Sequence, residues 1–420
     1  MKKTVLGIGR PKIAVPISPE SEAEAAKLAE AAKNAGADLI EFRADACSGC
    51  RSELHIGERL KAVSDHAGDI PILFTFRTSA EGGKTAVSAE EYEAYCLLAA
   101  ESGLVDMIDI EYAHSKAPAL LKAVHEIGLP VVLSNHDFHA TPDEDEIVSR
   151  LENMQRMGGD IAKIACMPGR HMDSVVAEAA AAAAGKRLSI PYIVISMGEA
   201  GTDTRLSGEV YGSAVTFGAL PDRASAPGQL NIPELRTKLE EIHAVRSGDS
   251  GFIFLIGFMG TGKTTAALKL SERIGLPVIE MDARIEAEQG KTISRIFEEE
   301  GEEAFRDMES ELLAGLFREK SAVVSCGGGC VLRNMNADLM KALGKVVRLT
   351  AKPETLLARL EGEADNRPNI RGRMTVEGIS GLMEKRRPYY ESAADFVIET
   401  DEKSVDDICR EVNECLYSRN

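Results

Sequence analysis

Short apolar runs alternate with longer helical stretches rich in Ala and Glu over residues 11–235. This alternation is typical of repeated βα units around a parallel sheet, and eight runs over this length predict a (β/α)8 barrel, also called a TIM barrel. The helical stretches at 21–36 and 172–185 each end in glycine, as helix C-caps often do. The eight runs are KIAVPI (12–17), DLIEFR (38–43), PILFTFR (71–77), VDMIDIEY (105–112), PVVLSNHD (130–137), DIAKIACMP (160–168), PYIVISMG (191–198) and AVTFGAL (214–220).

The pattern is interrupted after residue 245. NIPELRTKLEEIHAV at 231–245 predicts the helix that closes the barrel, and the small polar stretch RSGDSG at 246–251 predicts a linker. A second α/β unit begins at once with the apolar FIFLIG at 252–257. We therefore expect two domains, at residues 1–245 and 252–420.

The composition agrees with two folded domains. A chain of 420 residues exceeds the roughly 250–300 residues that one core usually supports, and 44% hydrophobic with 28% charged residues is typical of a soluble globular protein. The net charge of −18 disfavours nucleic acid and anionic membranes as partners. The first apolar run is too short for a signal peptide and no stretch approaches transmembrane length, so we expect a cytoplasmic protein.

The eight cysteines are spread along the chain, unlike those of a small disulfide-stapled secreted domain, and we expect free thiols. Cys47 and Cys50 form a single C-x-x-C, a pattern that serves as half of a zinc site or as a redox pair. Because no second pair lies at a suitable spacing, we interpret them as two loop thiols.

Polar side chains lie at the carboxyl ends of the predicted strands, which is the catalytic face of such a barrel. Lys163 is inside an apolar run, where burial destabilises an ammonium group. A neutral amine is a nucleophile toward carbonyl groups, so one interpretation of Lys163 is an imine-forming residue. The other is a lysine that snorkels or pairs with a barrel carboxylate. The polar residues are Glu41, Arg43, Arg77, Glu111, His136, Lys163 and Arg205.

His136 ends the run that precedes the run of Lys163. A single histidine taken alone is more often structural than catalytic. From a neighbouring strand, however, His136 reaches the same substrate as Lys163 and can move protons near neutral pH.

Several motifs, in order, resemble the type I 3-dehydroquinate dehydratases over nearly all of residues 11–235. The resemblance implies that Lys163 forms a Schiff base with the substrate ketone. It also implies that His136 removes the α proton and returns it to the departing hydroxyl. An aldolase would share the barrel and the imine lysine, but Arg205 and the SAPGQ segment favour a dehydratase. The motifs are EFR (41–43), TFRTSAEGG (75–83), SNHDF (134–138), AKIACMP (162–168), SMG (196–198), TRLSGEVYGSAVTFG (204–218) and ASAPGQ (224–229).

The same resemblance implies a set of substrate contacts. Arg205 binds the substrate carboxylate as a planar bidentate donor, and Glu81 positions His136. Glu111 we interpret as a structural carboxylate that pairs with Lys or Arg in the barrel mouth. The other implied site residues are Glu41, Arg43 and Arg77 in the pocket, and Ser225 and Gln229 in a lid.

The second unit opens with a strand, a glycine loop and a helix in immediate succession, at 252–275. This context supports a P-loop match, G-x-x-x-x-G-K-T, at 257–264. Backbone N–H groups of such a loop hold phosphate oxygens, Lys263 reaches the β and γ groups, and Thr264 binds Mg²⁺. All histidines lie at or before His243, so this unit must use other acids and bases.

The P-loop does not name the phosphoryl acceptor, but six segments of this unit resemble the shikimate kinases. They imply a nucleoside-monophosphate-kinase-like P-loop domain with a parallel sheet, which uses ATP and Mg²⁺. Asp282 would accept the proton of the attacking hydroxyl, and Arg306 and Arg386 would hold the shikimate carboxylate. The segments are GFMGTGKT (257–264), EMD (280–282), GEEAFRDME (301–309), CGGGCV (326–331), DNRP (365–368) and KRRPYY (385–390).

The resemblance also implies the nucleotide contacts and a glycine segment that lets substrate approach the backbone closely. Arg367 would neutralise charge on the transferring phosphoryl group, and Arg359 would lie near the adenine. The implied residues are Gly257, Gly260, Thr261, Gly262, Lys263, Thr264, Thr265, Arg359 and Arg367 for the nucleotide, and Gly327, Gly328 and Gly329 for the substrate.

The sequence thus predicts a bifunctional enzyme that dehydrates 3-dehydroquinate to 3-dehydroshikimate and phosphorylates shikimate to shikimate 3-phosphate. One departure is Glu280, where the kinase family usually has Asp, although a longer carboxylate still reaches hydrated Mg²⁺. The alternative joins an active dehydratase to a nucleotide-binding regulatory domain with impaired catalysis. Asp282, Arg306 and Arg367 argue against that alternative. The oligomeric state stays open, including a homodimer through the barrel domain.

Overall fold

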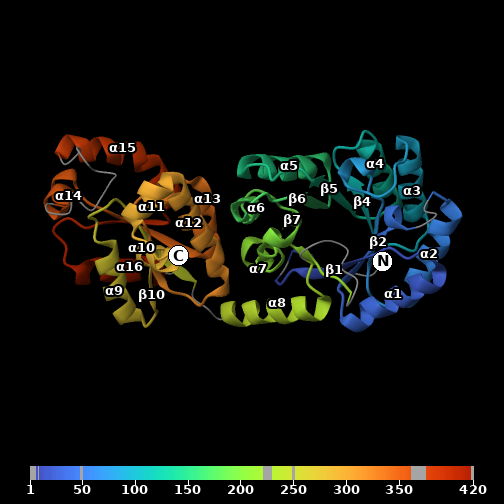
Figure 1. Ribbon diagram of the computed structural model, residues 1–420, viewed down its shortest axis with the longest axis horizontal. Helices are drawn as coiled ribbons and strands as arrows, with labels where there is room; N and C mark the ends of the chain where they lie inside the picture. The colour runs from blue at the N-terminus through green and yellow to red at the C-terminus, as the bar shows by residue number, and fades with distance from the viewer. Residues whose placement is uncertain are drawn as a thin grey trace. The chain divides into compact units, whose positions relative to one another are not determined.

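The computed structural model describes residues 6–7, 9–47, 51–220, 229–247, 251–360 and 375–417. The chain divides into two compact units, Met1–Ala244 and Val245–Asn420, whose elements are labelled in Figure 1. Within the described residues, no helix combines the length and apolar character needed to span a membrane.

The first unit contains eight parallel strands in the order β7-β6-β5-β4-β3-β2-β1-β8. The backbone N–H of Ala214 donates to the carbonyl of Tyr192 at 2.8 Å, so the segment entering β8 also meets β7 and the barrel is nearly closed. The predicted TIM-like barrel is therefore confirmed. The strands are β1 (Lys12–Ile17), β2 (Leu39–Arg43), β3 (Ile72–Thr75), β4 (Met107–Glu111), β5 (Val131–Asp137), β6 (Ile161–Cys166), β7 (Tyr192–Ser196) and β8 (Val215–Phe217).

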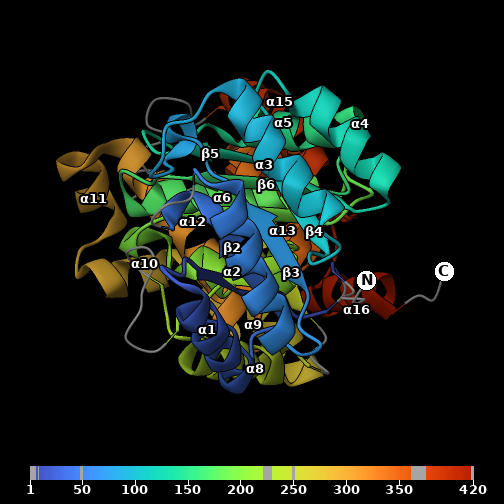
Figure 2. The same cartoon turned by 90° about the vertical axis from the view of Figure 1, so that its right-hand side faces the viewer.

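Helices follow the strands along the chain, and Figure 2 shows α1, α2 and α3 outside the strands. Local signals set their ends: in α1 the Ser21 hydroxyl caps the N–H of Glu24 at 3.2 Å, and Gly36 ends the helix at φ 83°, a conformation that glycine adopts without strain. The helices are α1 (Glu22–Ala35), α2 (Glu53–His66), α3 (Ala89–Glu101), α4 (Ala117–Ile127), α5 (Glu144–Met157), α6 (His171–Ala184), α7 (Gly208–Tyr211) and α8 (Ile232–Arg246), with 3-10 turns η1 (Ala44–Ala46), η2 (Ser79–Glu81), η3 (Glu199–Gly201) and η4 (Asp203–Arg205).

Apolar side chains from all eight strands or their entry segments pack into one cluster inside the barrel, including Leu39, Val132 and Ile193. The apolar runs of the sequence are nearly continuous because strands of a parallel barrel are buried on both faces. A polar side chain on such a strand is exceptional and marks the position of the site.

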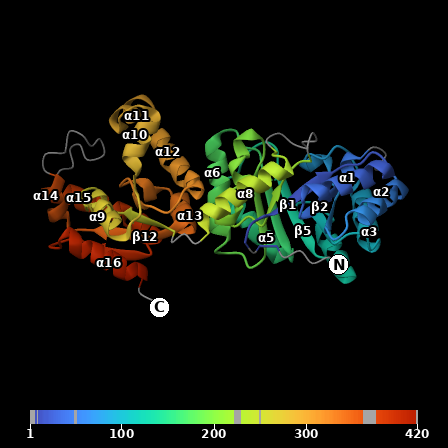
Figure 3. The ribbon, with the colours of Figure 1, turned by 90° about the horizontal axis from the view of Figure 1, so that it is seen from below.

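The second unit is built on a five-stranded parallel sheet in the order β10-β11-β9-β12-β13. Residues of α9 and α16 share one core cluster with the sheet, and these helices can be followed beside β12 in Figure 3. The strands are β9 (Phe252–Ile256), β10 (Val278–Glu280), β11 (Val323–Ser325), β12 (Gly344–Thr350) and β13 (Phe396–Glu399). The helices are α9 (Lys263–Ile274), α10 (Met281–Gln289), α11 (Ile293–Glu299), α12 (Gly301–Gly315), α13 (Asn334–Leu343), α14 (Pro353–Leu360), α15 (Val376–Ala393) and α16 (Val405–Tyr417), with 3-10 turns η5 (Leu316–Arg318) and η6 (Cys330–Leu332).

Two candidate active sites

A cavity of about 580 Å³ lies at the carboxyl ends of the barrel strands. It collects the predicted residues that the structure describes in this unit, although they come from six strands and the loops after them. Ser225 lies outside the described residues. The predicted residues that line the cavity are Glu41, Arg43, Arg77, Glu81, His136, Lys163, Arg205 and Gln229.

Lys163 on β6 is buried, with 4% of its surface exposed. Its Nζ lies 3.7 Å from Oε1 of Glu41 and 3.9 Å from Oδ2 of Asp109, and 4.5 Å from the ring centre of Phe217. The lysine therefore both pairs with barrel carboxylates and lines the cavity. The pairing interpretation thus matches the geometry, and the imine-forming interpretation stays a prediction with which this position is compatible.

His136 at the end of β5 is held by Glu81. Oε2 of Glu81 accepts the backbone N–H of His136 at 3.0 Å and lies 2.9 Å from its Nδ1. Burial, followed by the charges of Arg77, Lys163 and Arg43, lowers the pKa of His136 well below its usual range. The imidazole is therefore neutral near pH 7. When Nδ1–H donates its hydrogen bond to Glu81, Nε2 is left to accept a proton.

Glu81 is positioned in turn by neighbours on β5 and α5. Asn135 Nδ2 donates to Oε1 of Glu81 at 3.1 Å, and Arg150 Nη1 donates to Oδ1 of Asn135 at 3.0 Å. Burial raises the pKa of Glu81 to about 7. A carboxyl group that titrates near neutral pH beside an imidazole is a common feature of proton-transfer sites.

Arg77 is buried among three carboxylates. Its Nη2 lies 2.7 Å from Oδ1 of Asp109, and its Nη1 lies 3.4 Å from both Glu111 and Glu81. Burial alone would lower the pKa of Arg77, but these carboxylates raise it above its usual value. Glu111 also accepts two hydrogen bonds from Thr78 and does not line the cavity, as expected of a structural carboxylate.

Two further arginines line the cavity, and they differ in their contacts with neighbouring residues. Arg43 forms a two-point ion pair with the buried Asp45, at 2.9 and 3.0 Å. Arg205 is buried, and burial lowers its pKa to about 10. Its Nε has no hydrogen-bond partner among the described residues. A desolvated guanidinium on a cavity wall favours an anionic ligand.

Cys47 is buried in the segment after β2, and its Sγ lies 3.3 Å from the carbonyl oxygen of Arg43. Cys50 lies outside the described residues. The described part of the chain contains no group of three or more His, Cys, Asp or Glu side chains that could hold a metal ion.

A second cavity, of about 730 Å³, lies in the second unit beside β10, α12 and the glycine segment before η6. Arg306 on α12 is buried there, with its Nη1 2.6 Å from Oε2 of Glu309 and its Nη2 2.8 Å from Oε1 of Glu302. Burial raises the pKa of Glu309 to about 7. The predicted residues that line this cavity are Asp282, Arg306, Gly327, Gly328, Gly329 and Arg386, together with Glu280.

The glycine segment leaves room for charged side chains. A Cβ on Gly327 would lie 2.5 Å from Oε1 of Glu309 and 2.9 Å from Oδ1 of Asp282, and one on Gly329 would lie 2.3 Å from Nη2 of Arg306. Side chains at these positions would displace the acid and the arginine. The glycines are therefore required by the site itself, in addition to any close approach of substrate.

The P-loop follows β9 and leads directly into α9. Gly257 has φ 147° and Gly262 has φ 87°, conformations that favour glycine. Nζ of Lys263 lies 3.0 Å and 3.1 Å from the carbonyls of Gly257 and Phe258, so the amine lies over the loop. The other predicted loop residues are Gly260, Thr261, Thr264 and Thr265; Arg367 lies outside the described residues.

Two hydroxyl groups meet at the start of α9, next to the strand that carries Glu280. Oγ1 of Thr264 lies 3.1 Å from Oγ of Ser325, and Ser325 is paired in register with Glu280 on β10. Glu280 caps α10 by accepting the N–H of Ala283 at 2.8 Å, and burial raises its pKa. Arg359 donates to the carbonyls of Gly260 and Thr400, at 3.3 and 3.0 Å, and so borders the loop.

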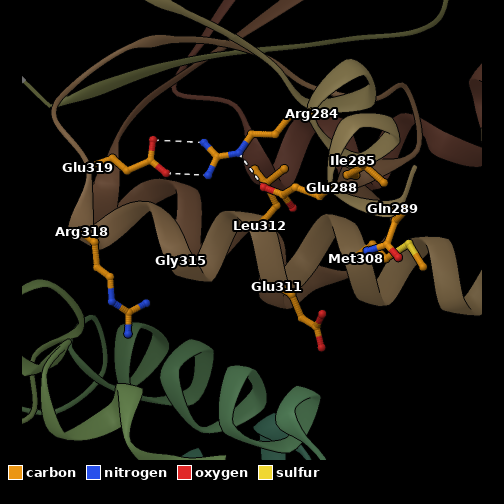
Figure 4. Close-up of a pocket in the computed structure, with 10 residues that line it drawn as sticks. All are labelled: Arg284, Ile285, Glu288, Gln289, Met308, Glu311, Leu312, Gly315, Arg318 and Glu319. Carbon is orange, nitrogen blue, oxygen red and sulfur yellow. Dashed lines mark hydrogen bonds and ion pairs between the residues drawn. The ribbon is translucent and has the colours of Figure 1, made fainter. Parts of the chain in front are cut away.

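A smaller cavity of about 310 Å³ lies between α10 and α12. Figure 4 shows Arg284 at one side of it, joined to Glu319 and Glu288. None of the predicted site residues lines this cavity. Of its arginines, Arg284 is already neutralised by two carboxylates.

Comparison with known proteins assigns both units. A family model described as type I 3-dehydroquinase matches residues 13–246. The chain belongs to this family. A 3-dehydroquinate dehydratase of Salmonella agona is 39% identical over 246 residues, covering 58% of this chain and 97% of that protein. The crystal structure of a type I 3-dehydroquinate dehydratase from Clostridium difficile, with covalently modified comenic acid, is 38% identical and has a TM-score of 0.55, covering 58% of this chain and 96% of that one.

A second family model, described as shikimate kinase, matches residues 259–417. A shikimate kinase from Acinetobacter baumannii in complex with shikimate is 32% identical, covers 42% of this chain and 97% of that chain, and has a TM-score of 0.39. The protein therefore joins a 3-dehydroquinate dehydratase and a shikimate kinase that uses ATP, two enzymes of the shikimate pathway.

Sequence reasoning missed polar residues that the structure brings to both sites. Asp109 and Ser134 lie beneath the dehydratase cavity, and Glu309 and Ser325 lie in the kinase site. An acidic residue within the apolar run at 105–112 was a signal for Asp109, comparable to that for Lys163. Glu309 lies one helical turn after Arg306, a spacing at which an ion pair is expected. Ser325 gave no distinct signal.

Proposed function

We propose that the dehydratase works through an imine between Lys163 and the ketone of 3-dehydroquinate. The observation that carries this proposal is a buried lysine lining the same cavity as His136 and Arg205. A desolvated amine adds readily to a carbonyl group, and an imine stabilises charge that develops at the neighbouring carbon. The covalently modified comenic acid of the Clostridium difficile relative is in keeping with covalent chemistry in this family.

The reaction then has four steps. Nζ of Lys163 adds to the carbonyl carbon and water leaves, giving a protonated imine. Nε2 of His136 takes a proton from the adjacent carbon, and the electron pair moves toward the imine nitrogen. The pair returns as the hydroxyl group leaves, taking the proton from His136 to form water. Addition of water to the imine releases 3-dehydroshikimate and restores Lys163.

The other predicted residues bind and orient the substrate. Arg205 pairs with the substrate carboxylate, which supplies an acceptor for a guanidinium whose buried Nε otherwise lacks one. Glu81 holds the Nδ1–H tautomer of His136, so Nε2 is the base. The remaining contacts are Glu41, Arg43, Arg77 and Gln229 around the cavity, and Ser225 in the lid.

In the kinase, Asp282 accepts the proton of the attacking shikimate hydroxyl, and Arg306 and Arg386 bind the shikimate carboxylate. In support, all three side chains line one cavity. Lys263 exchanges its contacts with the loop carbonyls for the β and γ phosphates of ATP. Arg359 and Arg367 complete the nucleotide site, near the adenine and the transferring phosphoryl group respectively.

The residues at the start of α9 fit Mg²⁺. Thr264 and Ser325 offer hydroxyl oxygens 3.1 Å apart, and Glu280 on the adjacent strand offers a carboxylate. Hard oxygen donors suit this ion, which keeps several waters. Bound Mg²⁺ would offset charge on the phosphate groups. Thr264 is the proposed direct ligand, and Glu280 the proposed partner of a bound water.

We also propose that the enzyme acts in the cytoplasm on small anions, without nucleic acid or membrane partners, in keeping with its net charge of −18. A homodimer through the barrel domain is proposed as its oligomer. Light scattering of the full chain tests the dimer, because a monomer mass of 45.2 kDa would reject it.

Two single variants test the site assignments in one chain. Lys163→Ala should abolish dehydration and keep shikimate-dependent ADP formation, whereas Asp282→Asn should do the reverse. If ADP formation in the parent did not depend on added shikimate, the second domain would instead be a regulatory nucleotide-binding module. If Lys163→Ala kept dehydration, the imine assignment would be wrong.

A further inference from the structure

Asp109 lies in the middle of β4 and is fully buried. Its Oδ1 accepts hydrogen bonds from Nη2 of Arg77 at 2.7 Å and from Oγ of Ser134 at 2.8 Å. Its Oδ2 has no hydrogen-bond partner among the described residues and lies 3.9 Å from Nζ of Lys163. One oxygen is thus anchored, and the other is held facing the lysine.

We propose that Asp109 is a positioning residue of the dehydratase, whose carboxylate is the fixed counter-ion that keeps the Lys163 imine protonated. The proposal rests on the imine mechanism above. A neutral imine is a poor electron sink, because the electron pair released at the adjacent carbon then has no positive nitrogen to move toward. A buried negative charge within about 4–6 Å favours the protonated form.

Two carboxylates lie near Nζ of Lys163, and that of Asp109 is held more firmly than that of Glu41. Glu41 lies 3.7 Å from Nζ, but it lines the cavity and is held by one hydrogen bond from Thr75. Asp109 does not line the cavity, and two donors fix it from behind. Substrate entry can reorient Glu41, whereas Asp109 stays in place.

The charges around Arg77 also support a role for Asp109 as the counter-ion of Lys163. Arg77 contacts three carboxylates, those of Asp109, Glu81 and Glu111, so one guanidinium does not neutralise the group. Within the described part of the barrel, the other charged or titratable groups near Lys163 are Glu41 on β2 and His136 on β5, and burial keeps His136 neutral by lowering its pKa. The cluster therefore retains negative charge, which the positive charge of a protonated imine at Nζ balances.

The positive charge on the imine nitrogen changes as the reaction proceeds. Imine formation joins Nζ to the carbonyl carbon, releases water and leaves one proton and one positive charge on nitrogen. When His136 takes the α proton, the electron pair of the C–H bond neutralises this nitrogen. The charge returns when the pair expels the hydroxyl group, which His136 protonates. Asp109 keeps its position throughout and makes no bond to substrate.

The test is a pH titration of the imine formed by the full chain with 3-dehydroshikimate, whose conjugated imine absorbs at a longer wavelength when protonated. Asp109→Asn removes the charge and keeps the shape, so the midpoint of this titration should fall by about 1–3 units. Turnover should fall while borohydride still traps an adduct on Lys163. Asp109→Glu, which keeps the carboxylate, should retain the midpoint of the parent.

Glu111→Gln is the matched control. It removes a carboxylate from the same arginine, but Glu111 binds Thr78 and not Lys163, so the imine titration should not move. If Asp109→Asn does not fold, Asp109→Ser takes its place, with the same expected fall. An unchanged titration in the Asn or Ser variant, or an equal fall in Glu111→Gln, would overturn the proposal. Absence of any adduct in the parent would overturn the imine mechanism itself, and this proposal with it.

Discussion

Oε2 of Glu81 lies 2.9 Å from Nδ1 of His136 and also accepts the backbone N–H of the same residue. One carboxylate oxygen therefore fixes both the ring and the chain of the histidine. This arrangement leaves Nε2 as the only ring nitrogen that can take a proton from substrate, and it makes the proton transfer depend on the ionisation of Glu81.

A rise of dehydratase kcat/KM between about pH 6 and 8 should follow that ionisation. Burial raises the pKa of Glu81 to about 7, so the acid form persists to neutral pH and the accepting carboxylate is lost as pH falls. The pKa of His136 is lowered, so the imidazole stays neutral over this range. Glu81→Gln should lower kcat by about tenfold or more and remove the rise. A parent profile that is flat from pH 6 to 8 would contradict this role.

His136→Ala should lower dehydratase turnover by about 10²–10⁴-fold, the usual range for a positioned proton-transfer group. Imine formation should persist in part, because Lys163 supplies the electron sink independently. The intact chain should then accumulate a covalent adduct visible by mass spectrometry. Turnover close to that of the parent would mean that His136 is structural.

The barrel was predictable because its eight strands are apolar on both faces and separated by helical stretches. Boundaries differ by a few residues: the run at 71–77 contains β3 at Ile72–Thr75, since Arg77 already turns into the ion-pair network. Lys163 was recognisable as a charge inside such a run. The partnership of Asp109 with Lys163 was not, because it joins strands 54 positions apart in the sequence and only the closed sheet brings them together.

Lys263→Ala should abolish phosphoryl transfer and leave dehydration unchanged within error. The reason is that each unit has its own core and its own cavity, and that the Lys263 amine lies over the P-loop, at the carbonyls of Gly257 and Phe258. Parallel assays of ADP formation and dehydration on the same preparation measure this. A large loss of dehydratase activity in a folded variant would reveal coupling between the two activities.

Glu280→Asp should change the Mg²⁺ requirement of the kinase more than its affinity for shikimate. Glu280 is paired in register with Ser325, whose hydroxyl meets that of Thr264, whereas Asp282 lies beside Gly327 in the substrate cavity. The shorter acid can still cap α10, because Asp is a favourable N-cap residue. Asp282→Asn should remove most turnover while ATP still binds.

The measurement is a magnesium titration of shikimate-dependent ADP formation in the parent, Glu280→Asp and Asp282→Asn, with chelation of Mg²⁺ as the zero point. An unmoved magnesium curve in Glu280→Asp, together with a strong shift in shikimate affinity, would show that the two carboxylates have the opposite roles.

Borohydride reduction in the presence of 3-dehydroquinate tests the central chemistry most directly, because it converts an imine into a stable amine at the lysine that formed it. Peptide mapping of the full chain should find one adduct, on Lys163, with dehydratase activity lost and shikimate-dependent ADP formation retained. An adduct on another lysine, or dehydration with no adduct at all, would contradict the account.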